Sequence, residues 1–355
     1  MKCTMNKRFI LCCFALVCAI ISMAQGKAYN FTNQVTFTKS GSGEITRFIG
    51  IMPVPQSDEY QTVRNFTCSH GNIMEDANYG NKALLFDTNE FPGQTLTMKT
   101  NFDVMTNVVS VDFSKVKIKD YDSNSEACKQ HLGNRGEYIN ITHPYIVRTG
   151  DELWSQSSDI IDYARRCYEY VASHFRYING SFRTLQQILD EGGGECGDFS
   201  TLVVNLLRYK GIPSRHIICL KLNGVCHVWA DFYIEGYGWI PLDAQMKNAN
   251  PRSDYFGKYN GECIVVAKDF SYDYAEVDFD MDFLQTYYYW YWYNGTTTSI
   301  NGQHTTKNNG QATGLDNISA SNATTPSGTY SLSGMHVNPQ IKGIVIKDGK
   351  KILNR

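Results

Sequence analysis

The sequence has no excess of charge of either sign. Lysine and arginine together number 33, aspartate and glutamate number 35, and the formal net charge is -2. The sequence isoelectric point is about 6.4. Binding of nucleic acid as a main activity needs a basic surface that neutralises phosphates. The balanced charge therefore argues against nucleic acid as the main partner.

The sequence also lacks an apolar run long enough to cross a bilayer comfortably. Its N-terminal apolar stretch, residues 9–23, follows three basic residues and ends at Ser22-Met23-Ala24. A basic start, a short apolar region and small residues at the cleavage positions are typical of a secretory signal peptide. We therefore expect residues 1–24 to be a cleaved leader rather than a retained anchor, and the mature protein to be secreted or held at the cell surface.

Cysteine is present in an odd number after the expected leader. Four of the 11 cysteines lie in residues 1–24, and the others are Cys68, Cys128, Cys167, Cys196, Cys219, Cys226 and Cys263. At least one thiol therefore has no partner within the chain. A two-residue turn at Asn223-Gly224 would place Cys219 opposite Val228 and Lys221 opposite Cys226. We expect that Cys219 and Cys226 do not form a disulfide.

The pattern of apolar residues divides the chain. Over residues 25–125, short runs with period-two alternation are separated by turn residues, which predicts an all-β sandwich domain. Over 126–293, helical spacing at 160–175 and 199–207 is followed by strands at 216–222, 225–233 and 239–243. Helices followed by antiparallel strands predict an α+β domain.

The last part of the chain changes composition again. Residues 294–329 are rich in Gly, Asn, Thr and Ser, which predicts a flexible linker, and 330–355 regain alternation, which predicts a small β module. The aromatic string at 287–293 is interpreted as a strand with one buried face rather than a stacking surface for a ligand.

Cys196 is the first candidate for chemistry. It follows Gly192-Gly193-Gly194-Glu195 and stands at the start of the helix predicted over 199–207. Unpaired N–H groups and the positive end of the helix dipole favour a thiolate there. A structural or disulfide-bonded cysteine after a glycine-rich loop is the alternative.

Two further residues complete a candidate triad. His227 opens one predicted strand, and imidazole is the usual group that takes a proton from a thiol. Asp243 ends the next strand and could fix the tautomer of the ring. A histidine buried in the core without a catalytic role is the alternative for His227.

Four segments then resemble the transglutaminase-like superfamily, a branch of the papain-like cysteine enzymes, over roughly residues 155 to 245. The matching segments are Gly194-Glu195-Cys196-Gly197-Asp198-Phe199-Ser200, Leu207-Arg208-Tyr209-Lys210-Gly211-Ile212-Pro213-Ser214-Arg215, His227-Val228-Trp229 and Gly238-Trp239-Ile240-Pro241-Leu242-Asp243. The resemblance implies a papain/transglutaminase-like core in which the cysteine helix packs on an antiparallel sheet. It also implies that Cys196 is the nucleophile, His227 the general base and acid, and Asp243 the residue that orients His227.

A second resemblance concerns the C-terminus. Residues 330–337 and 342–351 are similar to the C-terminal sorting domains of the bacterial type IX secretion route. This similarity implies a Gram-negative bacterium and attachment to the outer membrane or cell surface through the tail.

These observations predict a secreted transglutaminase-like cysteine enzyme that acts on peptide or protein amides through a thioester. Peptide hydrolysis, deamidation and amide transfer share one triad, so all three remain open. No metal or organic cofactor is required. The alternative from another class is a catalytically inactive transglutaminase-like module that binds at the cell surface.

Overall fold

The computed structural model describes residues 24–180, 182–277, 281–312, 329–330, 343–347 and 350–354. The chain divides into two compact units, Met1–Gln311 and Ala312–Arg355. The expected leader lies outside the described residues except for Ala24, as does most of the expected linker beyond residue 312.

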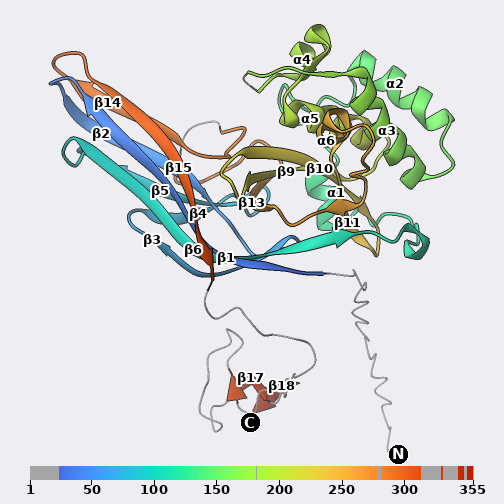
Figure 1. The fold of residues 1–355 in the computed structure, drawn as a ribbon, viewed down its shortest axis with the longest axis horizontal. Coiled ribbons are helices and arrows are strands. Elements are labelled where there is room, and N and C mark those ends of the chain that lie inside the picture. Colours follow the sequence, from blue (N-terminus) through green and yellow to red (C-terminus); the bar gives the residue numbers. More distant parts are fainter. Residues whose placement is uncertain are drawn as a thin grey trace, which may run out of the picture. The chain divides into compact units, whose positions relative to one another are not determined.

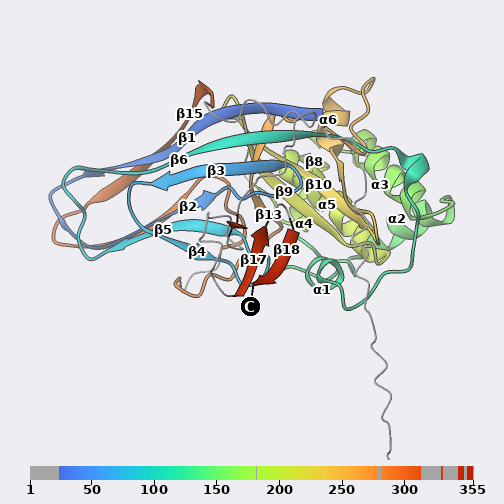
Figure 2. The same ribbon diagram turned by 90° about the horizontal axis from the view of Figure 1, so that it is seen from below.

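Two antiparallel sheets form the β-sandwich (Figures 1 and 2). One has the strand order β12-β6-β1-β15, with β3 also paired to β6, and the other has the order β14-β2-β5-β4. The bounds are β1 (Ala24–Ser40), β2 (Glu44–Val54), β3 (Gln61–Cys68), β4 (Asn72–Glu75), β5 (Lys82–Thr88), β6 (Thr95–Ser110), β12 (Lys258–Tyr259), β14 (Tyr288–Asn294) and β15 (Ser299–Gln311). Alternate residues of facing strands, such as Phe37, Phe48 and Met98, meet in a core between the sheets.

The expected end of the sandwich at residue 125 and the expected linker from residue 294 were both wrong. β14 pairs with β2, and β15 pairs with β1 along almost its whole length, so residues 288–311 complete both sheets. β15 buries only Ile300. Because its other side chains are half-buried or exposed, the strand has no apolar alternation that would reveal it in the sequence.

The aromatic string forms β14, as predicted. Tyr289 and Tyr291 pack against the sandwich core. Tyr288 is 41% exposed and Trp292 is 40% exposed on the other side of the strand. The string is therefore a strand, as interpreted, but neither face is fully buried, because Tyr289 and Tyr291 on one side and Trp290 on the other are half-buried.

The second part of the first unit is a layer of helices against a four-stranded antiparallel sheet of order β11-β10-β9-β13. Its strands are β9 (Ser214–Lys221), β10 (Cys226–Ile234), β11 (Gly238–Leu242) and β13 (Cys263–Lys268), with a short parallel pair of β7 (Arg176–Tyr177) and β8 (Gly193–Gly194) beside it. The helices are α1 (Glu126–His131), α2 (Pro144–Ser155), α3 (Ile160–His174), α4 (Leu185–Glu191), α5 (Cys196–Tyr209) and α6 (Ala244–Ala249), with a 3-10 turn at Phe113–Lys115.

Helix α5 lies at the centre of this part. Every residue from Gly197 to Arg208 is buried. Its side chains pack on α3 through Tyr163 and Val171 and on β10 through Ala230 and Phe232. A helix that is buried on all faces has its ends held firmly by its neighbours. The predicted α+β fold with a cysteine helix packed on an antiparallel sheet, preceded by an all-β sandwich, is confirmed.

The β9–β10 hairpin differs from the expected register by one residue. The Lys221 N–H donates to the Val225 carbonyl at 2.8 Å, so the loop has three residues rather than two. Cys219 then pairs with His227, and Cys226 pairs with Leu220. The two cysteines are not bonded to each other, and all seven cysteines among the described residues are free thiols.

The sandwich and the helical part share side-chain contacts. Tyr60, which precedes β3, packs edge-on against Trp229 and Tyr259. Gln61 holds the backbone of Val265 in β13 with two hydrogen bonds of 2.7 and 2.9 Å. The two domains expected from the sequence thus form one compact unit.

The second unit contains a three-stranded sheet of order β16-β17-β18, from β16 (Thr329–Tyr330), β17 (Gly343–Lys347) and β18 (Lys350–Asn354). Its strands fall in the region for which a β module is expected. Across the described parts of both units, no helix is both long and apolar enough to cross a membrane.

Candidate active site

Cys196 is positioned by the turn that begins α5. The Glu195 N–H donates to Asp198 Oδ2 at 2.8 Å, and the Glu195 side chain accepts from the Gly180 N–H at 2.9 Å. Gly194 is required because a Cβ there would lie 2.1 Å from Asp198 Oδ2. The glycine before Glu195 thus serves a close approach of the backbone to a carboxylate.

Asp198 is itself fixed by burial and by an arginine. Its side chain is fully buried, and Arg183 donates to it from the backbone N–H at 3.0 Å and from Nη1 at 3.1 Å. Burial raises the pKa of Asp198, although the hydrogen bonds from Glu195 and Arg183 oppose that change. These contacts hold the start of α5, and therefore Cys196, in one position.

The start of α5 is also bound to the strand that carries His227. The Ser200 hydroxyl donates to the Cys196 carbonyl at 2.9 Å and lies 3.4 Å from the Val228 carbonyl. Gln285 acts from the other side, because its amide donates to the carbonyls of His227 and Cys219, each at 3.0 Å. The sequence analysis did not identify Gln285 or Asp198 as positioning residues.

His227 lies between Cys196 and Asp243. Its Nε2 is 2.6 Å from Asp243 Oδ2, while Asp243 Oδ1 accepts from the Met246 N–H at 2.9 Å and caps α6. The Cys196 side chain is also close enough to the ring to raise the pKa of His227. Because Nε2 faces Asp243, Nδ1 is the nitrogen left for the sulfur. The structure therefore brings together all three residues that the sequence singled out.

The electrostatics of the site favour a protonated ring. Burial alone would lower the pKa of His227. The charge and hydrogen bond of Asp243, together with the hydrogen bond of Cys196, outweigh burial and raise the pKa from 6.5 to about 10. An imidazolium beside a sulfur stabilises the thiolate form of a cysteine.

This shift predicts a pH-dependent contribution to stability. A histidine whose pKa is raised in the folded state stabilises the fold fully below pH 6.5, and the contribution is lost as the pH rises toward about 10. We expect the difference in free energy of unfolding between wild type and His227→Gln to be largest near pH 6 and to shrink toward pH 10. Urea unfolding at several pH values measures it, and a difference that grows with pH would contradict the assignment.

A cavity of about 340 Å³ adjoins the pair of His227 and Asp243. Its described lining includes Trp229 and Tyr259, whose rings stack, and Lys221 at the end of β9. It lies where the sheet meets β6 of the sandwich, which contributes Val108, Val109 and Ser110. The site thus has a reactive group and an adjoining space for a ligand.

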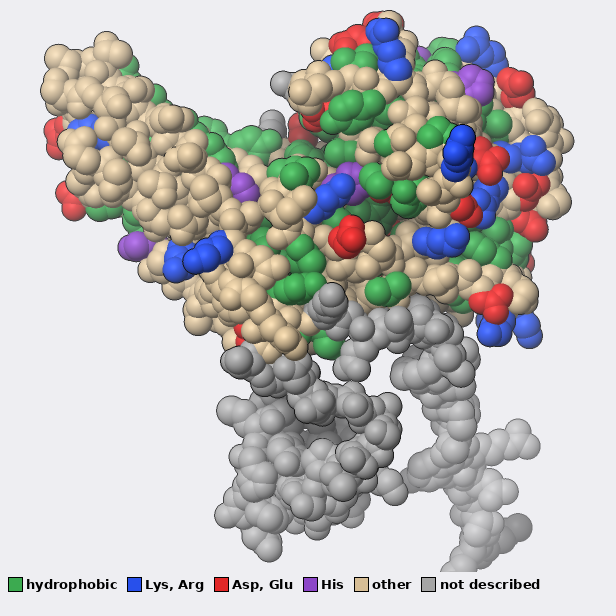
Figure 3. Space-filling view, in the orientation of Figure 1, with side chains coloured by type: hydrophobic (Ala, Val, Ile, Leu, Met, Phe, Trp, Pro, Cys, Tyr) green, Lys and Arg blue, Asp and Glu red, His purple; other side chains and the backbone are tan. Residues whose placement is uncertain are grey.

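The face of the molecule in Figure 3 shows how charge is distributed around these elements. Lysine and arginine side chains alternate with aspartate and glutamate over the helical part, while uncharged side chains and backbone cover most of the sandwich. Gln186 and Gln187 are exposed residues of α4, where Gln186 donates to Asp190 and the Gln187 side chain accepts from the Thr184 N–H.

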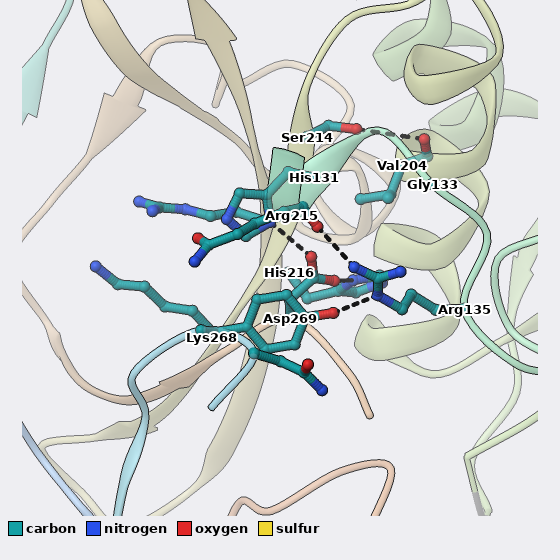
Figure 4. A network of polar contacts seen from close by, with 12 residues as sticks. His131, Gly133, Arg135, Val204, Ser214, Arg215, His216, Lys268 and Asp269 are labelled. Atoms are coloured by element: carbon teal, nitrogen blue, oxygen red, sulfur yellow. Dashed lines mark hydrogen bonds and ion pairs between the residues drawn. The ribbon is translucent and has the colours of Figure 1, made fainter. Parts of the chain in front are cut away.

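A second polar network lies between α5 and the sheet, away from the triad (Figure 4). Asp269, fully buried, accepts from Arg208 Nη2 and from His131 Nδ1, the latter at 2.7 Å, and His216 Nδ1 lies 3.5 Å from it. Arg208 also donates to the Ser214 carbonyl at 2.8 Å. The sequence analysis quoted Arg208 only as part of a motif and did not identify Asp269.

Comparisons with known proteins agree with the fold of the part that carries these residues. Residues 148–244 match the model of the transglutaminase-like superfamily. An uncharacterized protein of Haemophilus influenzae is 24% identical over 278 residues, which are 63% of this chain and 72% of that protein.

One solved structure supports the fold, and a second shows a weaker similarity. The crystal structure of a proposed cysteine protease from Cytophaga hutchinsonii superposes with a TM-score of 0.52 at 16% identity, over 82% of this chain and 94% of that one. The periplasmic domain of TgpA from Pseudomonas aeruginosa gives a TM-score of 0.35 at 11% identity, over 64% and 90% of the two chains. The segment that carries Cys196, His227 and Asp243 is thus the part of the chain that is similar to the transglutaminase-like superfamily.

Proposed function

We propose that this protein is a cysteine enzyme that acts on amide bonds of peptides or proteins through a thioester. Cys196 is the nucleophile, His227 the general base and acid, and Asp243 the residue that orients the ring. The observation that carries the proposal is the position of His227, with Nε2 held at 2.6 Å by Asp243 and the ring close enough to Cys196, at the start of α5, for that side chain to raise its pKa. A helix N-terminus stabilises negative charge on the sulfur.

The steps follow from these positions. His227 Nδ1 holds the proton of the Cys196 thiol, and the sulfur attacks the amide carbonyl to form a tetrahedral intermediate. The Cys196 N–H, at the first turn of α5, is one donor for the oxyanion. The C–N bond breaks as His227 gives the proton to the leaving nitrogen, and the acyl group stays on Cys196 as a thioester.

The group that attacks the thioester decides the overall reaction. Water gives peptide hydrolysis when the leaving group is a peptide amine, and gives deamidation when it is ammonia. A primary amine gives amide transfer. We favour peptide hydrolysis or amide transfer, and the protease assignment of the structural neighbour from Cytophaga hutchinsonii agrees with the former. In this proposal the enzyme acts after export, outside the cytoplasm or at the cell surface.

A binding module is the second candidate. The outward side of β14, with Tyr288 and Trp292 both about two-fifths exposed, offers an aromatic contact surface in the sandwich. If binding were the only activity, Cys196 would react with alkylating agents no faster than Cys68, which is an exposed thiol.

The test compares the mature wild-type protein with Cys196→Ala. Both are incubated under reducing conditions with a pool of glutamine-containing peptides, with and without a primary amine, and the products are identified by mass spectrometry. We expect new fragments, deamidated peptides or amine adducts with wild type and none with Cys196→Ala. Cys226→Ser is the matched control because it removes a neighbouring exposed thiol. Products that persist in Cys196→Ala would overturn the proposal.

A further inference from the structure

The cavity beside His227 lies on the side of the site where the leaving amine departs. His227 and Asp243 line it, and Cys196 is absent from its described lining. The acyl carbon must lie at the sulfur, whereas the leaving nitrogen must lie within reach of the histidine that protonates it. A group in this cavity is therefore on the amine side of the scissile bond, a conclusion that rests on the proposed function.

Lys221 places a positive charge in this cavity. It is the last residue of β9, two positions beyond Cys219, which pairs directly with His227. Residues two apart on a strand point to the same face, so Lys221 is the diagonal neighbour of His227, roughly 7–8 Å away between Cα atoms. Cys263, another lining residue, pairs with Lys221 from β13.

The ammonium group of Lys221 has no carboxylate within ion-pair distance among the residues that the structure describes. The other lining lysine differs, because Lys258 Nζ lies 3.9 Å from Asp254 and its side chain is 54% exposed. Glu262 also lines the cavity and is exposed. Of the two lysines that line the cavity, Lys221 is therefore the one that is half-buried, lies next to His227 and is available to a ligand.

The remaining lining is mixed: Ser110, Asp254 and Asn260 lie beside an apolar part, and the cavity is of limited size. Trp229 and Tyr259 stack with ring centroids 5.2 Å apart, and Val109 is buried beside them. A volume of about 340 Å³ lies at the lower end of the range for ligand pockets, and it holds one or two amino-acid residues. An apolar floor beside a single available ammonium fits a short group that is apolar in body and ends in an anion.

We propose that Lys221 determines specificity by binding a carboxylate on the amine side of the scissile amide. The substrate class is a peptide whose leaving portion carries this carboxylate within about one residue of the cleaved bond. The carboxylate can be the C-terminus or an acidic side chain, since both present the same group to the ammonium. Lys221 acts on binding and orientation, and not in proton transfer.

Two activated esters that differ only in the leaving group test this inference. 4-Nitrophenyl acetate releases a phenolate without a carboxylate, and 5-acetoxy-2-nitrobenzoate releases one with a carboxylate. In both, the S–C bond to Cys196 forms as the C–O bond to the phenolate breaks, and the thiol proton stays on His227 until solvent takes it. The second-order acylation rates are divided by those of a small free thiol, which removes the intrinsic difference in reactivity.

The ratio of the two corrected rates is the readout, because it cancels any general loss of activity in a variant. We expect wild type to favour the carboxylated ester, and Lys221→Gln to lower the ratio by about ten- to a hundredfold, as expected when one charge-assisted hydrogen bond is lost. Lys258→Gln should change the ratio less than twofold. An unchanged ratio in Lys221→Gln, or an equal loss in both variants, would overturn the inference.

Further experiments distinguish a failure of the proposed function from a failure of the carboxylate site. They also distinguish a C-terminal carboxylate from an acidic side chain. If no phenolate release depends on Cys196, the proposed function fails, and titration of 5-hydroxy-2-nitrobenzoate into Cys196→Ala then decides the carboxylate site. Binding that Lys221→Gln does not weaken would overturn it. Peptides with a free or amidated C-terminus, and with or without an adjacent acidic residue, distinguish the sources.

Discussion

Asp269→Asn is expected to destabilise the folded protein by about 3–5 kcal/mol, because it leaves the guanidinium of Arg208 buried without a counter-charge. Both side chains of this ion pair are fully buried. Asparagine is chosen because the backbone φ of Asp269 is +61°, in the left-handed region that asparagine tolerates and alanine does not. The loss of stability therefore reports the removal of the charge rather than backbone strain.

In the buried surroundings of Asp269, neither water nor a change of protonation can compensate for the loss of its negative charge. Burial by itself would raise the pKa of Asp269, but the charge of Arg208 and the hydrogen bonds of His131 and His216 hold it well below its ordinary value. Burial lowers the pKa of His131 to about 4, although Asp269 opposes that change, and it lowers the pKa of His216 as well. The histidines are thus neutral near pH 7, and the carboxylate balances Arg208.

Urea unfolding at pH 7 measures this prediction. Asp151→Asn is the matched control, since Asp151 pairs with Lys210 at 2.6 Å but is 57% exposed. Water screens such a surface pair, so its loss should change stability far less. A loss below about 1 kcal/mol for Asp269→Asn would mean that Arg208 finds another partner.

His227→Ala is expected to reduce the Cys196-dependent rate by about 10²–10⁴-fold, the usual contribution of general acid–base catalysis. The ring is held on one side by Asp243 and on the other by Cys196, so its removal takes away both the proton acceptor and the charge that stabilises the thiolate. Asp243→Ala should lower the rate by a smaller factor, because the ring remains present but loses its orientation.

Two measurements check this prediction: the turnover of whichever peptides the wild type modifies, and the rate of alkylation of Cys196 by iodoacetamide. Alkylation is followed in a background in which the exposed Cys68 and Cys226 are replaced by serine. His174→Ala, at an exposed position on α3, is the control. An alkylation rate that is the same in wild type and His227→Ala would refute the pair.

The sequence predicted the parts of the fold and site that depend on local patterns. The helical spacing after Cys196 predicted α5, and the order of Cys196, His227 and Asp243 predicted a constellation that the structure brings together. Each of these residues lies at or next to the end of a secondary-structure element. Cys196 begins the buried helix α5, His227 is the second residue of β10, and Asp243 caps α6.

The features that the sequence did not predict correctly depend on contacts between distant segments. Asp269 and Arg208 lie 61 positions apart, and Gln285 contacts the His227 carbonyl across 58 positions, so no local pattern reveals either contact. The hairpin register failed because Asn223-Gly224 is compatible with loops of two or three residues, and the main-chain bond of Lys221 to Val225 selects three.

The pairing of β1 with β15 has a consequence for the order of assembly. Thr36 lies opposite Gln303, so the edge of β1 is completed by a strand that follows the helical part in the sequence. The helical part is thus an insertion within the sandwich, and one sandwich edge stays open until residues 299–311 have been synthesised. A chain that is interrupted before β15 would present the unpaired N–H and C=O groups of β1 to other chains, and aggregation through that edge is its expected fate.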